Sequence, residues 1–143
     1  MKIFYSGCLA SIAIASVAFL SEYTRHPLIL GSFGASCVLL FGFPQSPFSK
    51  AKNLILGHFL CTLCGLFFLY FLGTDWWFMA IAVGFASIIM QLTHTVHPPA
   101  GSNPVIIYLT QPDWSFLVFP TLVGTLMLFA ISQSSKRLSV LST

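Results

Sequence analysis

The sequence predicts an all-α membrane protein with four full transmembrane helices and two short, broken crossing segments. Three observations support this fold class: an apolar composition, charges placed only at the ends of apolar runs, and two segments interrupted by glycine and proline. Of the 143 residues, 57% are hydrophobic and 6% are charged, and the mean hydropathy is +0.91. A soluble domain carries about 25% charged residues, so we expect the lipid bilayer to surround this chain.

The charged residues lie between or beyond the apolar runs, where they avoid the high cost of a charge at the bilayer centre. They are Lys2, Glu22, Arg25, Lys50, Lys52, Asp75, Asp113, Lys136 and Arg137. The net charge is +3, but no basic stripe is interleaved with aromatic residues, so we expect no nucleic-acid partner. The acidic residues form no pair, and no phosphate-binding loop is present. We therefore expect no enzyme activity and no cofactor.

Four apolar runs are long enough to cross a bilayer, which needs about 20 residues with a range of about 17–25. They are Ile3–Leu20, Leu54–Leu72, Trp76–Leu92 and Trp114–Ser132. Tryptophan begins the last two runs, as expected at a membrane interface. We expect the first run to be a retained helix, because Phe19 and Leu20 replace the small residues of a signal-peptide cleavage site.

Two further segments are apolar but broken. Leu28–Phe43 is short and interrupted by three glycines, and Thr93–Leu109 is cut by three prolines. If the second segment were a cytoplasmic loop, the last run would carry Lys136 and Arg137 to the outside. If it crosses, five of the six basic residues share one side, as the positive-inside rule favours. We therefore expect six crossings, with both termini in the cytoplasm.

Six crossings divide a single domain, residues 1–143, into half-repeats 1–73 and 74–137. The broken segment is the middle crossing of each half: one begins HPLILGS at His26 and the other HPPAGS at His97. Because each half has an odd number of crossings, the second half is inverted relative to the first. Paired, interrupted segments at corresponding places are a sequence indication of a transporter's binding site.

The broken segments also predict the chemistry of that site. Irregular backbone inside a membrane is tolerated only against protein or a water-filled cavity. Proline suits the first turn of a helix, so Pro27 and Pro98 are predicted to begin half-helices whose N–H groups face a cavity. Two converging helix N-termini favour a small anion. The predicted substrate-binding residues are Gly31, Ser32, Gly34, Ser36, Asn53, His58, His97, Pro98, Gly101, Ser102 and Asn103. His94 and His97 are the candidates for proton coupling.

Two other functions are open at this point. The stretch HFLCTLC places His58, Cys61 and Cys64 at i, i+3 and i+6, and such soft ligands suit copper(I) or zinc. On a helix, however, the first and last of these diverge by about 120°, so we expect no metal site without help from another helix. A structural or assembly subunit predicts a packed interior, whereas transport predicts a polar cavity between the broken segments. Gly57, Gly65, Gly84 and Gly124 are predicted to mark close helix packing.

Two longer stretches carry a family resemblance: GSFGASCVLLFGFPQSPFSKAKNLILGHFL and MQLTHTVHPPAGSNPVI. Together they resemble the HPP family of small integral membrane proteins, named for the motif at His97, Pro98 and Pro99. The resemblance spans roughly Gly31 to Gly124. It implies a compact bundle usually described with four transmembrane helices, from which the six-crossing prediction departs.

The resemblance also suggests a substrate. Some plastid and cyanobacterial members are associated with nitrite transport, which makes nitrite the leading candidate here. The family commonly has arginine where His94 stands, and the absence of that charge weakens a direct transfer of anion selectivity. The added Pro104 strengthens the prediction of a broken backbone. We expect a homo-oligomer in a bacterial inner membrane.

Overall fold

The protein is all-helical in the computed structural model, which describes the backbone of residues 2–141 and the side chains of residues 3–136. The α-helices are α1 (Lys2–Thr24), α2 (Ser32–Cys37), α3 (Ala51–Phe71), α4 (Trp76–Leu92), α5 (Asn103–Thr110) and α6 (Val123–Leu141). Short π- and 3-10 segments join them: η1 (Val38–Gly42), η2 (Pro47–Ser49), η3 (Pro98–Ser102), η4 (Trp114–Leu117) and η5 (Val118–Leu122). Lys2 and Arg137, which enter the predicted sidedness, have side chains outside the described set.

Among the described residues, three helical stretches are both long and apolar enough to cross a membrane. They are Ile3–Thr24, Ala51–Phe71 and Trp114–Lys136. Two shorter apolar stretches accompany them, the 17-residue helix α4 and the continuous helical segment Ser32–Gly42. The all-helical fold is confirmed, with three long spans where four were predicted.

Both predicted broken segments contain a short helix that follows an irregular stretch. After α1, the backbone turns at Arg25 with a φ of 57°, and α2 begins only at Ser32. After α4, it turns at His94 with a φ of 53°, and η3 begins at Pro98. The prediction that a proline begins the helix is therefore right for Pro98 and wrong for Pro27, which lies in the irregular stretch before α2.

The last predicted run is not one continuous helix. It begins with η4 and η5, and Phe119 has non-helical dihedral angles just before Pro120. Proline removes a backbone N–H and disfavours helical geometry in the residue before it, so regular helix starts only at Val123. At the start of this segment, Asp113 accepts hydrogen bonds from the hydroxyl and the backbone N–H of Ser115, and these lower the pKa of its carboxyl group.

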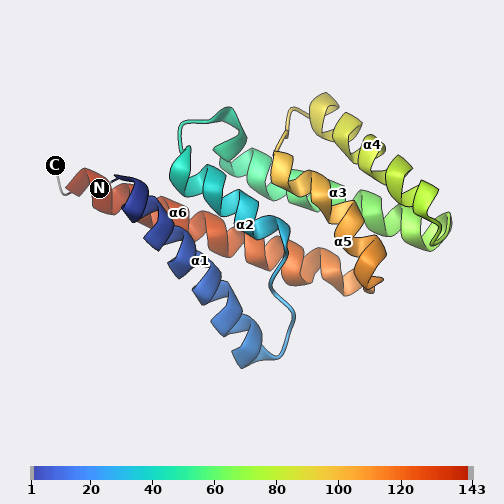
Figure 1. Cartoon of the computed structure of the whole chain (residues 1–143), viewed down its shortest axis with the longest axis horizontal. Coiled ribbons are helices and arrows are strands. Elements are labelled where there is room, and N and C mark those ends of the chain that lie inside the picture. The colour runs from blue at the N-terminus through green and yellow to red at the C-terminus, as the bar shows by residue number, and fades with distance from the viewer. Residues whose placement is uncertain (1, 142–143) are drawn as a thin grey trace.

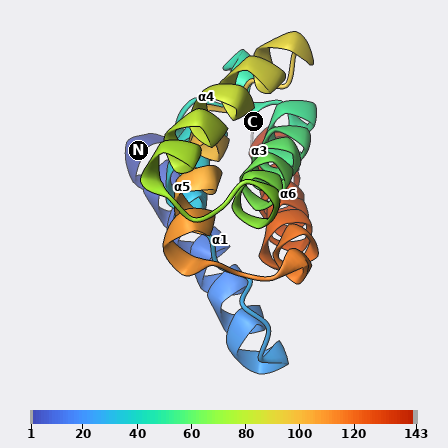
Figure 2. The same cartoon turned by 90° about the vertical axis from the view of Figure 1, so that its right-hand side faces the viewer.

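The helices pack around two hydrophobic cores that do not follow the sequence halves. One core joins α1, α2, η1 and the start of α3 to α6, and includes Val17, Phe33, Leu54 and Leu128. The other joins α3 and α4 to η3 and α5, and includes Leu66 and Ile107. Helices α3 and α6 lie side by side in both views (Figure 1, Figure 2). The third helix of each half therefore packs against the first two helical segments of the other half.

The two ends of the molecule differ in composition. The start of α1 and the end of α6 lie together at the left of Figure 1, and the turn between α3 and α4 lies at the right. Trp76 and Trp77 begin α4 directly after that turn. Trp114 stacks on Tyr70 near the end of α3, with 5.5 Å between ring centroids. All three tryptophans of the chain are therefore at the end of the molecule opposite the start of α1 and the described end of α6.

Candidate functional site

A cluster of uncharged polar side chains lies buried where the two short helices meet α3. We call it the polar cluster; its members are Ser32, Ser36, His58, Thr62, His97, Asn103 and Thr121. Each is 0–3% exposed. Among the described residues, no buried side-chain nitrogen or oxygen lacks a hydrogen-bond partner. The cluster is thus a closed, fully paired network inside an apolar protein.

The two short helices are joined at their first residues. Ser32 begins α2 and Asn103 begins α5. The Ser32 hydroxyl donates to the Asn103 Oδ1 atom at 2.8 Å, across 71 positions of sequence. The sequence predicts that half-helices beginning at Pro27 and Pro98 converge. In the structure the two helix starts joined by a side-chain hydrogen bond are Ser32 and Asn103.

Ser36 bridges the two buried histidines. Its Oγ lies 3.0 Å from His58 Nε2 and 2.9 Å from His97 Nε2, and the ring centroids are 5.1 Å apart. The Ser36 hydroxyl also lies 3.1 Å from the carbonyl of Ser32, one helical turn earlier. A single hydroxyl therefore links α2 to both imidazoles.

The outer partners of the two rings determine their tautomers. His97 Nδ1 lies 2.8 Å from the Phe48 carbonyl oxygen, which can only accept, so Nδ1 carries the hydrogen and Nε2 accepts. The Asn103 amide nitrogen lies 3.1 Å from His58 Nδ1 and can only donate, so His58 carries its hydrogen on Nε2. Ser36 consequently accepts from His58 and donates to His97. In the neutral network, each hydrogen bond from Asn103 through His58, Ser36 and His97 to Phe48 therefore has one assigned donor and one assigned acceptor.

A second branch of the cluster leads from α5 to the segment before α6. The Asn103 amide donates to Thr62 Oγ1 at 2.8 Å. Thr62 and Thr121 are 3.1 Å apart, and Thr121 donates to the Phe116 carbonyl at 2.8 Å. Since Thr121 uses its hydrogen on Phe116, Thr62 is the donor between the two hydroxyls. Asn103 is therefore the residue where both branches meet.

Helix α3 positions the cluster through its sequence. His58 and Thr62 are four residues apart and share one face of the helix. A Cβ atom at Gly57 would lie 2.9 Å from both the His97 Cβ and the Thr95 carbonyl oxygen, so only glycine allows this close approach. Asn53 donates to the Val96 carbonyl at 2.7 Å. Asn53 thus orients the chain that carries His97 and does not join the cluster.

Other predicted site residues lie outside the cluster. Gly31, Gly34, Pro98 and Ser102 are exposed, since they are on the outward sides of the short helical segments. Ser102 donates only to the nearby Pro99 carbonyl, at 2.8 Å.

Gly101 and His94 are also apart from the cluster. The nearest side-chain atom to a Cβ at Gly101 would be the Met90 Cε, at 3.9 Å. His94 is exposed at the turn after α4. The structure therefore brings together Ser32, Ser36, His58, His97 and Asn103 of the predicted set.

Thr62 and Thr121 belong to the cluster and were not predicted. The signal for Thr62 is its spacing of four from His58 on an apolar helix. The signal for Thr121 is its place directly after Pro120, where the helix is broken.

The described residues contain no group of three or more His, Cys, Asp or Glu side chains that could hold a metal ion. Cys61 and Cys64 are buried, and the Cys64 thiol donates to the Ala82 carbonyl at 3.4 Å. Within the stretch HFLCTLC, His58 therefore lies in the polar cluster, whereas Cys64 contacts α4.

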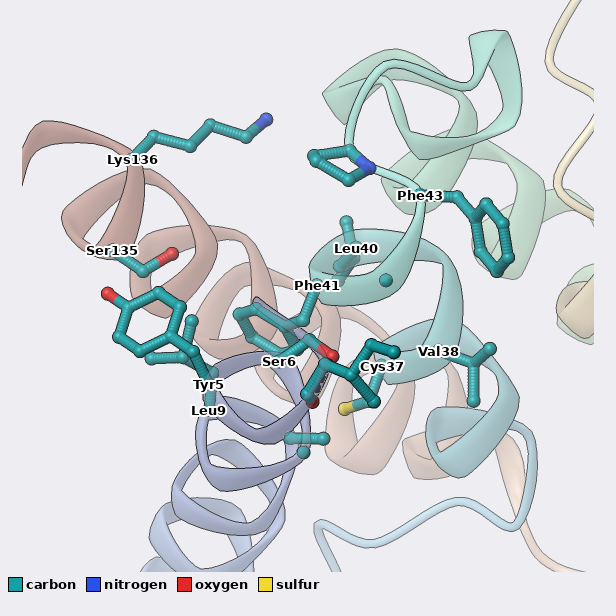
Figure 3. Close-up of a pocket in the computed structure, with 15 residues that line it drawn as sticks. Tyr5, Ser6, Leu9, Cys37, Val38, Leu40, Phe41, Phe43, Ser135 and Lys136 are labelled. Carbon is teal, nitrogen blue, oxygen red and sulfur yellow. Dashed lines mark hydrogen bonds between the residues drawn. The ribbon is translucent and has the colours of Figure 1, made fainter. Parts of the chain in front are cut away.

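A separate cavity of about 630 Å³ opens between the start of α1, η1 and the end of α6 (Figure 3). Its lining is mainly apolar, with Tyr5, Ser6, Ser135 and Lys136 as polar members. Cys37 lines it, while the preceding residue, Ser36, faces the polar cluster. No member of the cluster lines this cavity.

The fold and composition define a class, that of small all-helical integral membrane proteins with a buried polar centre. Within this class, the chain belongs to the HPP transmembrane-region family, whose family model matches residues 1–141. This match confirms the resemblance seen in the sequence motifs.

Two curated proteins of Dictyostelium discoideum are similar to this chain, and both are named only as transmembrane proteins. One is 34% identical over 109 residues, covering 71% of this chain and 38% of the relative. The other is 33% identical over 106 residues, covering 68% of this chain and 34% of the relative. The chain thus spans little more than a third of the length of these relatives. No solved structure matches.

Proposed function

We propose that this protein is a transporter or channel that passes a small anion between α2 and α5, with nitrite as the leading substrate. The observation that carries the proposal is the polar cluster itself. Buried polar residues inside a membrane protein are costly and commonly mark the path of an ion or substrate. This cluster lies where two interrupted segments meet, the usual place for a transporter's binding site.

The chemistry of the cluster supports an anion of small size. Its hydroxyl, amide and imidazole groups supply several hydrogen-bond donors without a fixed positive charge. Ser32 and Asn103 place donors at the starts of the two short helices. Nitrite as the substrate rests on the family association, whereas the preference for a small anion rests on these donors.

The packing supports an inverted 3+3 arrangement of residues 1–73 and 74–137. Helix α6 packs into the core of α1 and α2, and α3 packs into the core of α4 and α5. Such a reciprocal exchange is what two inverted halves would make. In this proposal α4 is the fourth full crossing. Its 17 residues at 1.5 Å per residue would need a locally thinned bilayer.

A second candidate is a structural or assembly subunit that transports nothing. It is favoured by the complete pairing of the polar cluster, since a packed interior is what a structural role requires. A transporter must open the same cluster, so the closed network would be its occluded state.

The transport proposal extends to a homo-oligomer in a bacterial inner membrane, without enzyme activity and with both termini cytoplasmic.

Uptake of nitrite, nitrate, formate and chloride into proteoliposomes tests the proposal. We expect at least one of these anions to enter faster than in protein-free vesicles. His97→Ala should reduce that flux by about tenfold or more, because it removes a buried member of the cluster. His26→Ala is the matched control, since His26 also precedes a proline but is exposed and stacks on Phe119.

The other outcomes separate the alternatives. Copper or zinc uptake without anion uptake would establish the soft-metal alternative instead. A folded protein that moves none of these solutes would support the structural subunit. Flux that survives His97→Ala would make His97 only a packing residue.

A further inference from the structure

We propose that the anion crosses together with a proton held on the bridged pair of His58 and His97, so that the substrate is a monovalent anion. This inference rests on the proposed transport function and specifies its coupling. It is carried by the direction of the hydrogen bonds in the polar cluster and by the absence of a fixed charge among its members.

No described side chain around the two rings supplies a positive charge to balance an anion. The rings of Phe33 and His58 pack nearly perpendicular to each other, with 5.5 Å between centroids. The titratable and charged groups on the packed elements are Cys37 on α2, Lys50 after η2, Lys52, Cys61, Cys64 and Tyr70 on α3, His94 after α4, and Tyr108 on α5. Cys64 donates to the Ala82 carbonyl and Tyr70 to the Pro112 carbonyl. Lys50 and His94 are exposed, and Lys52 donates to the Thr93 carbonyl at 3.2 Å. Cys37 faces the other cavity, and Tyr108 donates to the Gly73 carbonyl. An anion alone would therefore be an uncompensated charge in a water-poor interior.

The hydrogen-bond count of the closed cluster favours the same conclusion. An anion brings acceptors and no donor. If the Ser36 hydroxyl turned toward it, the His97 Nε2 atom would lose its donor and remain as an unpaired buried acceptor. A proton on that Nε2 atom corrects this, because His97 then donates to the Phe48 carbonyl from Nδ1 and to the anion from Nε2. The charge and the hydrogen bonds are both balanced only when one proton accompanies the anion.

The serine bridge allows the proton to move between the two rings. If His58 is protonated on both nitrogens, its Nε2 proton passes to Ser36 Oγ while the Ser36 hydroxyl proton passes to His97 Nε2. The products are a neutral His58 with its hydrogen on Nδ1, an unchanged serine and a protonated His97. Two short proton transfers thus carry one positive charge across the bridge.

Protonation also affects the junction of the two short helices. A hydrogen on His58 Nδ1 requires an acceptor, yet the Asn103 amide nitrogen occupies that position. The amide must rotate to present Oδ1 to His58, and this breaks the bond in which Ser32 donates to the same oxygen. The arrival of a proton at His58 therefore loosens the direct contact between α2 and α5.

The experiment uses proteoliposomes that contain a pH-sensitive dye, with nitrite added outside and protein-free vesicles subtracted for passive entry of nitrous acid. We expect one proton to enter for each nitrite ion, faster uptake when the outside is acidic, and no response to a potassium diffusion potential. Nitrite flux that follows the membrane potential without proton entry would overturn this inference and leave the transport proposal intact. No protein-dependent anion flux would overturn the transport proposal itself.

Two variants test the residues. His58→Gln keeps a neutral hydrogen-bonding group but holds no proton, and Ser36→Ala removes the bridge. Each should reduce proton-driven nitrite uptake by about tenfold or more. The controls are His26→Gln, at an exposed ring, and Ser16→Ala, which removes a serine hydroxyl that donates to the Ile12 carbonyl on α1. Both controls should transport normally. Wild-type uptake by folded His58→Gln or folded Ser36→Ala would exclude this pair as the proton carrier.

Discussion

Asn103 connects three elements because its side chain can accept at one end and donate twice at the other. It accepts from Ser32 on α2 and donates to His58 and Thr62 on α3. No other residue type of similar size offers this combination at the start of a helix. The orientation of the whole polar cluster therefore depends on a single amide.

Replacing Asn103 with leucine should destabilise the protein. The variant keeps a similar volume but leaves the Ser32 hydroxyl without its acceptor and the His58 Nδ1 atom without its donor. An unpaired buried polar group costs about 1–3 kcal/mol, so we expect a loss on the order of 2 kcal/mol or more, measured by unfolding in detergent. Ser102→Ala, next to it but exposed, should change little; equal stability of the two variants would contradict this account.

At the scale of single residues, the sequence predicted five of the seven members of the polar cluster and missed Thr62 and Thr121. Histidine and asparagine stand out in apolar segments, because they need partners there. Serine and threonine can instead bond the carbonyl one helical turn earlier, as Ser16 and Thr24 do. Ser32 and Ser36 were predicted because they lie in the glycine-interrupted segment Leu28–Phe43, whereas Thr62 and Thr121 do not. Gly31 and Gly34 were predicted to bind the substrate, but both are exposed, and a Cβ at Gly34 would meet nothing within 4 Å.

At the scale of elements, glycines set how closely α3 and α6 approach the short helices. A Cβ at Gly65 would lie 2.9 Å from the Pro104 Cα on α5. A Cβ at Gly124 would lie 3.0 Å from the Leu28 carbonyl and closer still to the Phe33 ring. The prediction of close packing is confirmed for Gly57, Gly65 and Gly124. Within this chain Gly84 marks no close packing, because a Cβ there would meet no atom of another helix within 4 Å.

Gly57→Ala should therefore lower the stability of the protein, whereas Gly84→Ala should leave it unchanged or raise it. The first forces a methyl group against backbone and should destabilise the protein by about 1–3 kcal/mol, as overpacking does. The second adds a good helix former in open space and should be neutral or stabilising by up to about 1 kcal/mol. Thermal unfolding of both in one detergent measures the difference. A Gly57→Ala protein as stable as Gly84→Ala would show that α3 can move away from the segment around His97.

The sequence predicted some of the helical elements correctly and missed a break in another. The paired short segments could be located because glycine, proline and histidine interrupt apolar runs. The break at Pro120 was missed, since one proline in a run of suitable length does not show whether the helix bends or stops. Hydrogen bonds from distant residues, such as Thr62 to Thr121, help decide that outcome, and no local pattern contains them.

At the scale of the whole molecule, the two hydrophobic cores make the halves interdependent. Because α3 and α6 each pack with the other half, neither half could bury its own apolar surface if separated. Sequence periodicity cannot reveal such an exchange, since it depends on which helices become neighbours. The predicted boundary near residue 73 therefore does not coincide with a boundary between the two hydrophobic cores.

The clustering of all tryptophans at one end makes the protein's own emission a reporter of sidedness. Vesicles with the C-terminus outward can be captured through a C-terminal affinity tag. In those vesicles, iodide added outside should quench the indole emission weakly, and quenching should rise once the bilayer is permeabilised. Strong quenching before permeabilisation would place Trp76, Trp77 and Trp114 on the same side as the C-terminus and contradict the predicted orientation. Intrinsic fluorescence thus reads the membrane topology without an engineered cysteine or an attached dye.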